Sequence, residues 1–547
     1  MNHKILKIHP KDNVFVALDN LRQGETVSDG NETVVLLEDV RAKHKFAGTY
    51  LEKDDDVVMY GNLVGKTNVP IAQGAVLTTI NTTHKANTFS EKNTSIAWQP
   101  PNISKFKEKT FQGYHRGDGQ VGTANYWVVI PLVFCENRNV EVMKDAFLEE
   151  LGFAKPNRYK SYVRQMVSLY KAGKEAIVET TDLEQDIADT KPLFENVDGI
   201  KFLTHQGGCG GIRQDSEMLC ALIAGYLNNP NVAGGTILSL GCQNAQITIL
   251  KEKLAAINPG FNKPLFILDQ QQEGKESRLL GKAIQQTFTG LTIANKIQRK
   301  SAPLSKLTIG LECGGSDGFS GISANPAVGH VSDLIVALGG KTILSEFPEL
   351  CGVEQELINR CEDQVISEKF IALMQSYAAA AEAVGSGFDM NPSPGNIKDG
   401  LITDAMKSAG AAKKGGTSPI TDVLDYCEYA QKPGLNLLCT PGNDVESTTA
   451  LAGSGANIIL FTTGLGTPTG NPVTPVLKIA SNTTLAKKMP DIIDVDAGSV
   501  ITGEKTIADM GETLLDEIIA VASGAVKTKS QQLGQDDFIP WKRGVSL

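Results

Sequence analysis

From about residue 113 onward, short apolar segments alternate with amphipathic helical patterns, and this alternation constrains the fold of the 547-residue chain most strongly. Apolar segments that lack an alternating polar face predict strands buried on both sides, as in the parallel sheets of α/β proteins. Helical patterns such as 216–227 and 368–384 separate them. The predicted strands are 126–131, 200–204, 236–240, 265–268, 307–311, 341–344, 435–438, 457–461 and 476–479. We therefore expect α/β lobes with mainly parallel sheets.

The first 95 residues have a different pattern and predict a small β-rich domain. Short strands are expected at 14–18, 33–37, 56–60 and 75–80, separated by Gly, Asp and Asn turns. Residues 96–112, with two adjacent prolines and several lysines, predict a linker. The polar segment 298–303 divides the rest into a middle domain, 113–300, and a C-terminal domain, 301–547.

Charge and hydropathy exclude several function classes. The chain has 52 Lys and Arg against 62 Asp and Glu, a net charge of −10, and no dense basic block. This balance argues against a nucleic-acid or anionic-membrane surface. No apolar run approaches the ~18 residues of a membrane span, and the N-terminus has no signal-peptide core. We expect a cytoplasmic protein that binds neither nucleic acid nor membrane.

Many predicted strands end in loops rich in glycine or containing cysteine, namely 205–211, 241–244, 312–318, 439–444 and 462–470. Parallel strands bring their carboxyl ends to one edge of a sheet, where ligands bind. The loops do not fit nucleotide motifs. Gly340-Lys341-Thr342 lacks the first glycine of a P-loop, and 464–470 is one residue too long for a dinucleotide fingerprint. The nucleophile-elbow spacing at 314–318 is followed only by His330 as a possible triad histidine.

Cysteines follow several of these strands. Cys135, Cys209 and Cys242 each lie just beyond one, and His205 precedes Cys209 by four residues. Thiolate and imidazole ligands suit zinc, Fe(II) or an iron–sulfur cluster with one iron open to substrate. The alternative is that these cysteines pack as small hydrophobic residues, because cysteine is among the most buried residue types. The sequence leaves both interpretations open.

Acidic and amide side chains in the same loops suggest acid–base and substrate-binding groups. Glu312, Asp317 and Asp444 could act as bases, or could cap nearby helices. A guanidinium matches a carboxylate, so arginines are candidate clamps. The candidate substrate ligands are Arg116, Arg213, Asn391, Ser393, Asn396, Asn443 and Asp444. In the N-terminal domain, His44 and His84 lie beside predicted strands.

Longer motifs in these loops resemble the altronate/galactarate dehydratase family. The segments that carry the resemblance are 311–326, 391–396, 433–444 and 461–468, and the N-terminal segments 44–47 and 60–65 resemble the SAF-type domain of that family. The resemblance covers essentially the whole chain. It implies a lyase that removes water from a sugar acid, with D-altronate giving 2-keto-3-deoxy-D-gluconate on the route from galacturonate to central metabolism.

The resemblance also implies a divalent metal. We expect Fe(II), with Mn(II) and an iron–sulfur cluster as alternatives, because a cation stabilises the enediolate formed when a carboxylate loses its α-proton. The expected catalytic residues are His44, His205, Glu312 and Asp317. The expected metal ligands are Cys135, Cys209, Cys242 and His84. A homo-oligomer, most simply a dimer, is expected.

One departure from the family pattern concerns the N-terminal domain. Members often carry a His-x-His pair where this chain has residues 76–84, and His84 is the single histidine there. His84 then replaces the pair, or the metal lies elsewhere. Two rival functions stay open: a lyase for galactarate or a sulfonated hydroxy acid, and a metal-binding homologue that has lost catalysis.

Overall fold

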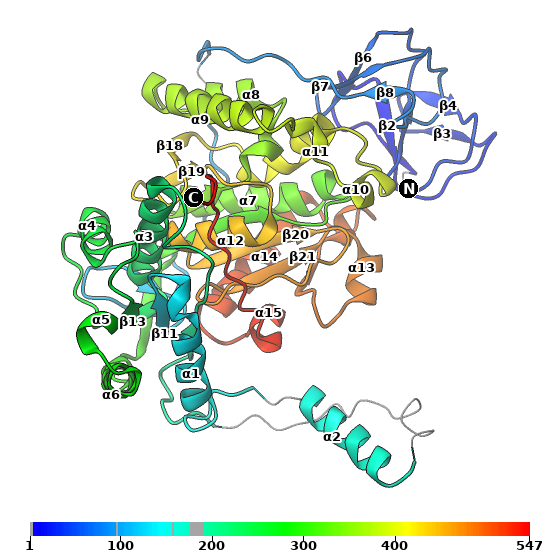
Figure 1. The fold of residues 1–547 in the computed structure, drawn as a ribbon. Helices are drawn as coiled ribbons and strands as arrows, with labels where there is room; N and C mark the ends of the chain where they lie inside the picture. Colours follow the sequence, from blue (N-terminus) through cyan, green and yellow to red (C-terminus); the bar gives the residue numbers. More distant parts are fainter. Residues whose placement is uncertain (1–3, 95–96, 156–157, 175–190) are drawn as a thin grey trace.

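The N-terminal domain is β-rich in the computed structural model, which describes residues 4–94, 97–155, 158–174 and 191–547 (Figure 1). Its strands are β1 (Ile5–Leu6), β2 (Val14–Ala17), β3 (Thr26–Ser28), β4 (Thr33–Val35), β5 (Lys45–Ala47), β6 (Asp56–Met59), β7 (Asn62–Thr67) and β8 (Thr82–Thr83). They form small antiparallel sheets ordered β1-β2-β5, β3-β4 and β6-β7-β8. The strand predicted at 75–80 is wrong: of these residues only Val76 forms a bridge, to Phe46. The Asn81 side chain bonds the backbone at Thr78 and Val76, and such local bonds compete with strand pairing.

The predicted linker ends in a strand that pairs with the predicted domain boundary. β9 (Thr110–His115) lies between β10 (Val121–Gly122) and β15 (Arg299–Pro303) in an antiparallel sheet. The end of the predicted linker and the polar segment 298–303 therefore pair as neighbouring antiparallel strands. Their sequences are polar because much of this sheet is exposed.

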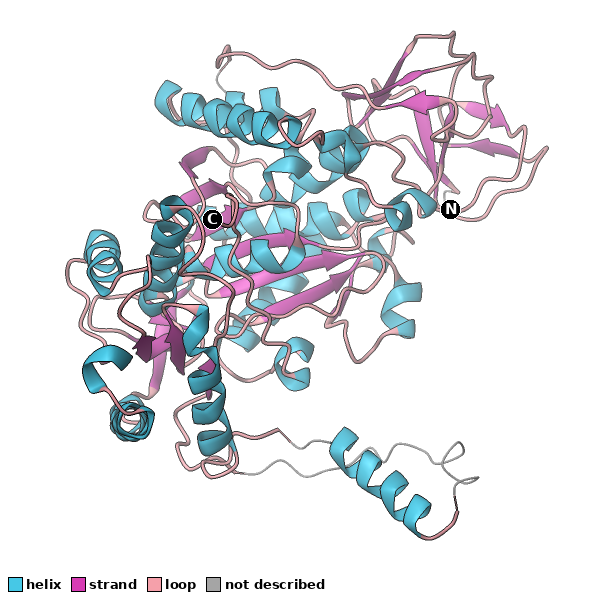
Figure 2. Ribbon diagram, in the orientation of Figure 1, coloured by secondary structure: helices cyan, strands magenta, loops and turns pink. Residues whose placement is uncertain are grey.

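The middle domain is a parallel sheet ordered β12-β11-β13-β14 with helices on both faces (Figure 2). Its elements are β11 (Tyr126–Pro131), α1 (Asn137–Leu148), α2 (Arg158–Lys171), β12 (Gly199–Phe202), α3 (Arg213–Asn228), β13 (Val232–Ser239), α4 (Ile247–Ile257), β14 (Leu265–Asp269), α5 (Gln270–Glu273) and α6 (Glu276–Ala294). Trp127 is fully buried, and its indole N–H donates to the Thr236 hydroxyl. Each predicted strand of this domain is present.

The C-terminal domain contains a parallel sheet ordered β18-β19-β17-β16-β20-β21-β22. The strands are β16 (Thr308–Cys313), β17 (Lys341–Leu344), β18 (Ile420–Leu424), β19 (Gly434–Leu438), β20 (Ile458–Thr463), β21 (Val476–Ala480) and β22 (Val495–Asp496). The helices are α7 (Ala324–Ala337), α8 (Glu354–Arg360), α9 (Gln364–Glu382), α10 (Pro394–Lys398), α11 (Asp404–Ala411), α12 (Asp444–Gly453), α13 (Thr483–Lys488), α14 (Ile507–Ala522) and α15 (Lys529–Leu533). Edge strands β18 and β22 were not predicted because they are short or carry polar residues.

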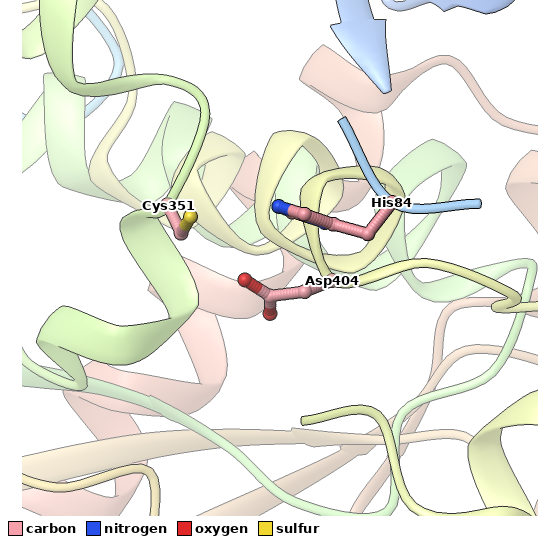
Figure 3. Close-up of side chains that lie close together, drawn as sticks. All are labelled: His84, Cys351 and Asp404. Atoms are coloured by element: carbon pink, nitrogen blue, oxygen red, sulfur yellow. The ribbon is translucent and has the colours of Figure 1, made fainter. Parts of the chain in front are cut away.

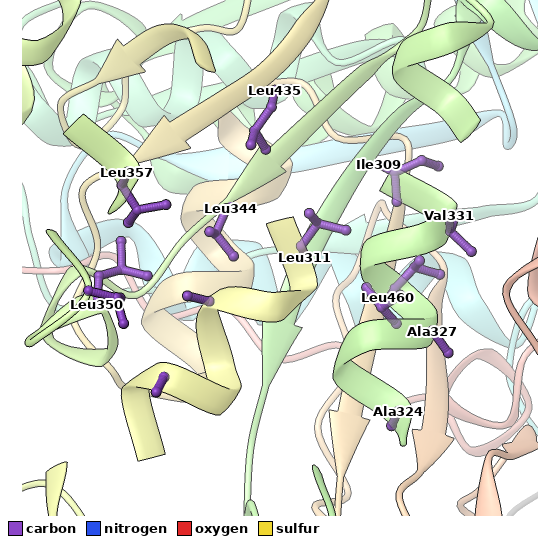
Figure 4. Close-up of a cluster of buried hydrophobic side chains, with 14 of the residues drawn as sticks. Ile309, Leu311, Ala324, Ala327, Val331, Leu344, Leu350, Leu357, Leu435 and Leu460 are labelled. Carbon is purple, nitrogen blue, oxygen red and sulfur yellow. The ribbon is translucent and has the colours of Figure 1, made fainter. Parts of the chain in front are cut away.

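The main hydrophobic core lies between this sheet and its covering helices. Ala327 and Val331 of α7 pack with Ile309, Leu311 and Leu460 of the central strands (Figure 4). This core fixes the central strands and therefore the position of the loops at their carboxyl ends. No helix within the described ranges is long and apolar enough to cross a membrane.

The two parallel sheets are joined by packed helices and by the C-terminal tail. Gly225 of α3 lies directly against Gly453 of α12, where no side chain would fit. In the tail, Arg543 pairs with Asp425, and the Leu547 amide donates to the Gly210 carbonyl in the loop that contains Cys209. The tail thus connects the C-terminal domain to the loop after β12.

Candidate active site

A buried network of charged groups lies at the carboxyl end of the central C-terminal strands. Cys313 ends β16, Glu346 and Glu349 follow β17, and Lys407 and Lys414 come from α11 and the turn after it. Lys414 Nζ lies 2.6 Å from Cys313 Sγ and 3.0 Å from Glu346, and Lys407 Nζ lies 2.6 Å from Glu349. The Cys313 thiol donates to Glu349 at 3.1 Å. We call these five residues the ionic network.

The charges of the ionic network balance. Burial opposes ionisation of Glu349, but Lys407 and Lys414 hold its pKa below the usual value. Burial also opposes the charge of Lys407, but Glu349 raises the pKa of that ammonium. Burial and the nearby carboxylates raise the pKa of the Cys313 thiol well above its usual range, so this thiol stays protonated. Burial and Glu349 raise the pKa of Glu346, and its ion pair with Lys414 opposes that shift. Each glutamate is thus paired with an ammonium group away from water, as buried charges require.

Glu312 lies behind the ionic network with no exposed surface. One carboxyl oxygen accepts hydrogen bonds from Ser345 and Ser447 at 2.7 and 2.6 Å, and the other has no partner. Burial, and then Glu346, raise the pKa of Glu312 well above its usual value. Burial and the neighbouring Glu346 carboxylate thus both favour the neutral form of Glu312. Glu346 itself has a left-handed backbone, φ 68°, a strained conformation that is enriched at functional sites.

The ionic network reaches the surface through Asn391 and Asp444. Asn391 is half-buried and bonds both Lys407, at 2.8 Å, and Glu349, at 3.3 Å. Asp444 begins α12 and is also half-buried. Its carboxylate lies against Gly314, where a Cβ would be only 2.1 Å from Oδ2. Burial, and then Glu346 and Glu349, raise the pKa of Asp444 to about 7. A carboxyl with that pKa can both accept and release a proton near neutrality.

Asp317 and His44, two expected catalytic residues, lie where the N-terminal domain contacts the C-terminal domain. The fully buried Asp317 carboxylate accepts bonds from Ser320, Ser481 and Asn482, and Lys43 pairs with it at 2.9 Å. His44 Nε2 lies 3.1 Å from the Lys398 carbonyl. The Lys43–Asp317 ion pair and the contact of His44 Nε2 with the Lys398 carbonyl both join the N-terminal domain to the C-terminal domain.

Several expected substrate ligands have structural partners. Arg116 is buried and donates to the carbonyls of Pro230 and Ala124 and to the Asn125 amide oxygen, so its guanidinium is committed. Ser393 and Asn396 form the capping box of α10. In the same way, Asn443 caps α12. Arg213 is exposed at the start of α3. Of the expected substrate ligands, Asn391 and Asp444 are the two that border the ionic network.

The three expected cysteine ligands are exposed, and they follow neighbouring strands. Cys135, Cys209 and Cys242 come after β11, β12 and β13. Their loops are bonded together: the Phe134 amide donates to the Gly207 carbonyl, and the Asn244 amide donates to the Gly208 carbonyl. We call these three residues the rim thiols.

His205 is part of the same edge but is buried. Its Nε2–H donates to the Pro131 carbonyl at 2.7 Å, and its Nδ1 accepts from the Gly207 amide at 3.1 Å. Burial lowers the pKa of His205 to about 4, so the ring is neutral. With both nitrogens occupied, His205 fixes the loop that carries Cys209.

Among the described residues, two groups each bring three possible metal-donor atoms within 4.8 Å of one another. In the first, Cys313 with Glu346 and Glu349, the ammonium groups already supply the positive charge, so an ion does not fit. The second is His84, Cys351 and Asp404, shown in Figure 3, and it includes a fully buried Asp404 oxygen with no partner. This nitrogen, sulfur and oxygen set fits a divalent transition metal. The rim thiols are in neither group.

Sequence reasoning missed four residues of the ionic network: Glu346, Glu349, Lys407 and Lys414. The glutamates follow β17, which was predicted, but their loop contains neither a glycine pair nor a cysteine at its start. The lysines lie on a helix and turn that no motif marked. A usable signal was that Glu346 and Glu349 lie just beyond the carboxyl end of a buried strand.

Comparison with known proteins agrees with this architecture. Three family profiles match: the altronate/galactarate dehydratase SAF domain over 3–85, the D-galactarate dehydratase/altronate hydrolase second domain over 113–295, and the D-galactarate/altronate dehydratase C-terminal domain over 304–546. Altronate dehydratase from Escherichia coli K12 is 34% identical, and altronate dehydratase from Bacillus subtilis 168 is 32% identical, each over 99% of both chains. Galactarate dehydratase (L-threo-forming) from E. coli K12 is 30% identical over 97% of this chain and 94% of its own.

These matches and the fold define a three-domain hydro-lyase, a dehydratase of sugar acids. The chain belongs to the altronate/galactarate dehydratase family.

Proposed function

We propose that this enzyme converts D-altronate into 2-keto-3-deoxy-D-gluconate and water at the exposed side of the ionic network. Two relatives that align over 99% of both chains are altronate dehydratases, and this supports D-altronate over galactarate. The observation that carries the proposal is the position of Asp444, half-buried, with a pKa of about 7, beside a compensated pair of buried lysines.

The reaction needs one base and one cationic environment. The base removes the proton from C2, next to the substrate carboxylate, and negative charge accumulates on that carboxylate as an enediolate. The C3–O bond then breaks, the departing hydroxide gains a proton to become water, and the resulting enol becomes the 2-keto acid. A proton must therefore be taken from C2 and another delivered at C3.

We assign both proton steps to Asp444. Its ionised form accepts the C2 proton, and its protonated form returns a proton to the departing hydroxyl. Lys407 faces the same opening through Asn391 and provides a fixed positive charge for the substrate carboxylate. Glu349, Cys313, Lys414, Glu346 and Glu312 hold Lys407 charged and in place.

A divalent metal completes the proposal, Fe(II) first and Mn(II) as the alternative. When bound, such an ion stabilises negative charge on the substrate oxygens. The rim thiols are proposed iron ligands, because cysteines are usually buried and these three are exposed on adjacent loops. Thiols of this kind suit a cluster in which one iron stays open to substrate.

The proposal is tested with protein purified anaerobically and assayed for a 2-keto-3-deoxy acid from D-altronate, galactarate and other sugar acids. We expect turnover of D-altronate without nicotinamide or ATP, and iron in the protein. A broad brown absorbance that is lost in Cys209→Ser and Cys242→Ser supports a cluster at the rim thiols.

Three outcomes contradict it. Faster turnover of galactarate than of D-altronate would make galactarate the substrate. Metal binding without turnover of any acid would favour a non-catalytic homologue. Normal iron content and turnover in both serine variants make the rim thiols structural.

A further inference from the structure

The contact between the N-terminal and C-terminal domains brings together three side chains that can bind metal. His84 lies just after β8 in the N-terminal domain, Cys351 follows the turn after β17, and Asp404 begins α11. One donor atom from each lies within 4.8 Å of the other two (Figure 3). His84 lies more than 250 positions before Cys351 and Asp404 in sequence, so only the docking of the two domains brings it to them.

The buried Asp404 carboxyl group is the strongest indication that these three residues bind a cation. Its side chain has no exposed surface, and its Oδ2 has no hydrogen-bond partner. Its other oxygen has a long contact, 3.5 Å, with the Ser408 hydroxyl, and the Cys351 thiol also lies within hydrogen-bonding reach of the carboxyl group. A buried carboxylate oxygen without a partner costs free energy that a bound cation would recover.

His84 has one weak partner, and Cys351 is paired with Asp404, a second member of the same group. The His84 ring accepts one long hydrogen bond at Nδ1, 3.4 Å from the Ala405 amide. Cys351 and His84 are only half-buried, so an ion can reach them from solvent. In contrast to the Cys313 group, no lysine or arginine forms an ion pair with Asp404 within the part of the chain that the structure describes.

The backbone around the group is packed so that the donors stay close. Gly352 has φ 90°, and a Cβ there would lie 3.1 Å from Ala405 and 3.2 Å from Ala86. Glycine at this position lets the segment after His84 approach both Cys351 and the first turn of α11. A larger residue would separate the N-terminal domain from the other two donors.

We infer that His84, Cys351 and Asp404 bind one divalent transition-metal ion, which joins the N-terminal domain to the C-terminal domain. One nitrogen, one sulfur and one oxygen ligand favour Zn(II), Fe(II) or Co(II) over Ca(II) or Mg(II), which prefer oxygen alone. Three protein ligands leave a position for water or another oxygen ligand. This site is separate from the rim thiols, and it does not depend on which acid the enzyme dehydrates.

The position of the site links it to the ionic network. Cys351 lies two residues after Glu349, and Asp404 lies one helical turn before Lys407. An ion held here would therefore fix the two elements that carry the Glu349–Lys407 pair. The predicted role of the ion is to keep Glu349 and Lys407 in contact and to attach the N-terminal domain to the C-terminal domain.

The test is Co(II) binding to metal-free, reduced protein, followed by visible absorption under anaerobic conditions. The protein carries serine in place of Cys135, Cys209 and Cys242, so that the rim thiols contribute nothing. We expect one Co(II) per chain with a thiolate charge-transfer band, and a rise in melting temperature. Because loss of an outer-shell partner alone weakens metal binding by about 10–100-fold, loss of a direct ligand should weaken it by about 100-fold or more.

Three variants locate the ion. Cys351→Ser should remove the charge-transfer band, while Asp404→Asn and His84→Gln should weaken binding and shift the remaining bands. Asp404→Asn is nearly isosteric and replaces the buried carboxyl group with a neutral amide. This variant should therefore fold even where another variant does not. A matched control, Glu362→Gln at an exposed carboxylate before α9, should bind Co(II) normally.

Two results would overturn the inference. One is the absence of a Co(II) band in the serine background, and the other is a band that survives Cys351→Ser. Neither readout uses substrate, so a failed search for the sugar acid would leave this result unaffected.

Discussion

The carboxyl ends of the two parallel sheets carry opposite kinds of chemistry. At the four-stranded sheet the chemical groups are exposed thiols on loops bonded by their backbones. At the seven-stranded sheet they are charged side chains that compensate one another out of contact with water. Both sets of groups lie at the carboxyl ends of parallel strands, where α/β proteins bind their ligands. The difference is that the exposed edge can lose a side chain cheaply, whereas the buried edge cannot.

The largest effect is expected when the charge balance of the ionic network is broken. Lys414→Met leaves Glu346 without its partner at 3.0 Å in a fully buried place. Breaking a buried ion pair on one side costs about 3–5 kcal/mol. We expect a large drop in melting temperature and loss of turnover. Lys413→Met, at the half-buried neighbouring lysine, is the control and should change little.

A second substitution sharpens this result. Adding Glu346→Gln to Lys414→Met removes the uncompensated charge, so much of the stability should return while turnover stays low. A double variant as unstable as the single one would mean that Lys414 acts by packing and not by charge.

The next effect concerns Asp444 and should appear in the rate, with the fold intact. Asp444→Asn removes the group assigned to both proton steps, and general acid–base groups contribute about 10²–10⁴-fold. In the unmodified enzyme, kcat/KM should rise with pH through about 7 as Asp444 ionises. The asparagine variant should lose that rise. Glu446→Gln, in the same helical turn, should keep both the rate and the pH profile. Equal profiles for the enzyme and Asp444→Asn would contradict the assignment.

His205 should make the free energy of unfolding of the domain that carries the rim thiols depend on pH. Burial lowers its pKa from 6.5 to about 4, so the unfolded chain takes up a proton that the folded chain refuses. The stability from neutral His205 is complete above pH 6.5 and is lost as the pH falls toward 4. At about 1.4 kcal/mol per unit, the loss reaches about 3 kcal/mol.

This linkage is measurable as a difference between melting temperatures. His205→Gln should be less stable than the unmodified protein at pH 7.5, and the gap should narrow steadily toward pH 4.5. His115→Gln, at an exposed histidine, should show a constant difference. A gap for His205→Gln that does not change with pH would show that this histidine is not kept neutral.

The sequence predicted the sheets better than it predicted the site. β11 and β17 begin and end where the apolar segments predicted, because buried parallel strands must be apolar on both faces. Residues 75–80 were predicted as a strand, but Asn81 and Thr78 bond the backbone locally there. β9 and β15 were predicted as connections because their sequences are polar, although they pair as strands.

The site was predicted where one loop follows one strand, and missed where distant segments meet. Asp444 and Asn391 stand in recognisable motifs. Lys407 and Lys414 are ordinary lysines in sequence, and their value comes from Glu349 and Glu346, which lie more than fifty positions away. Charge compensation of this kind is a property of the packed fold, so no local pattern reveals it.

The smallest effect is expected from cysteine-to-serine changes at the exposed edge, compared with the same change in the ionic network. In metal-free protein, Cys242→Ser replaces an exposed thiol, and such changes usually stay within about 0.5 kcal/mol. Cys313→Ser replaces a buried thiol that bonds both Lys414 and Glu349. A serine oxygen sits closer to the backbone and cannot keep both contacts, so a cost of about 1–3 kcal/mol is expected. Melting temperatures of the two variants, measured without metal, should therefore differ by several degrees. Equal shifts would contradict the contrast between the two edges, because they would mean that the rim thiols are held by packing as firmly as Cys313.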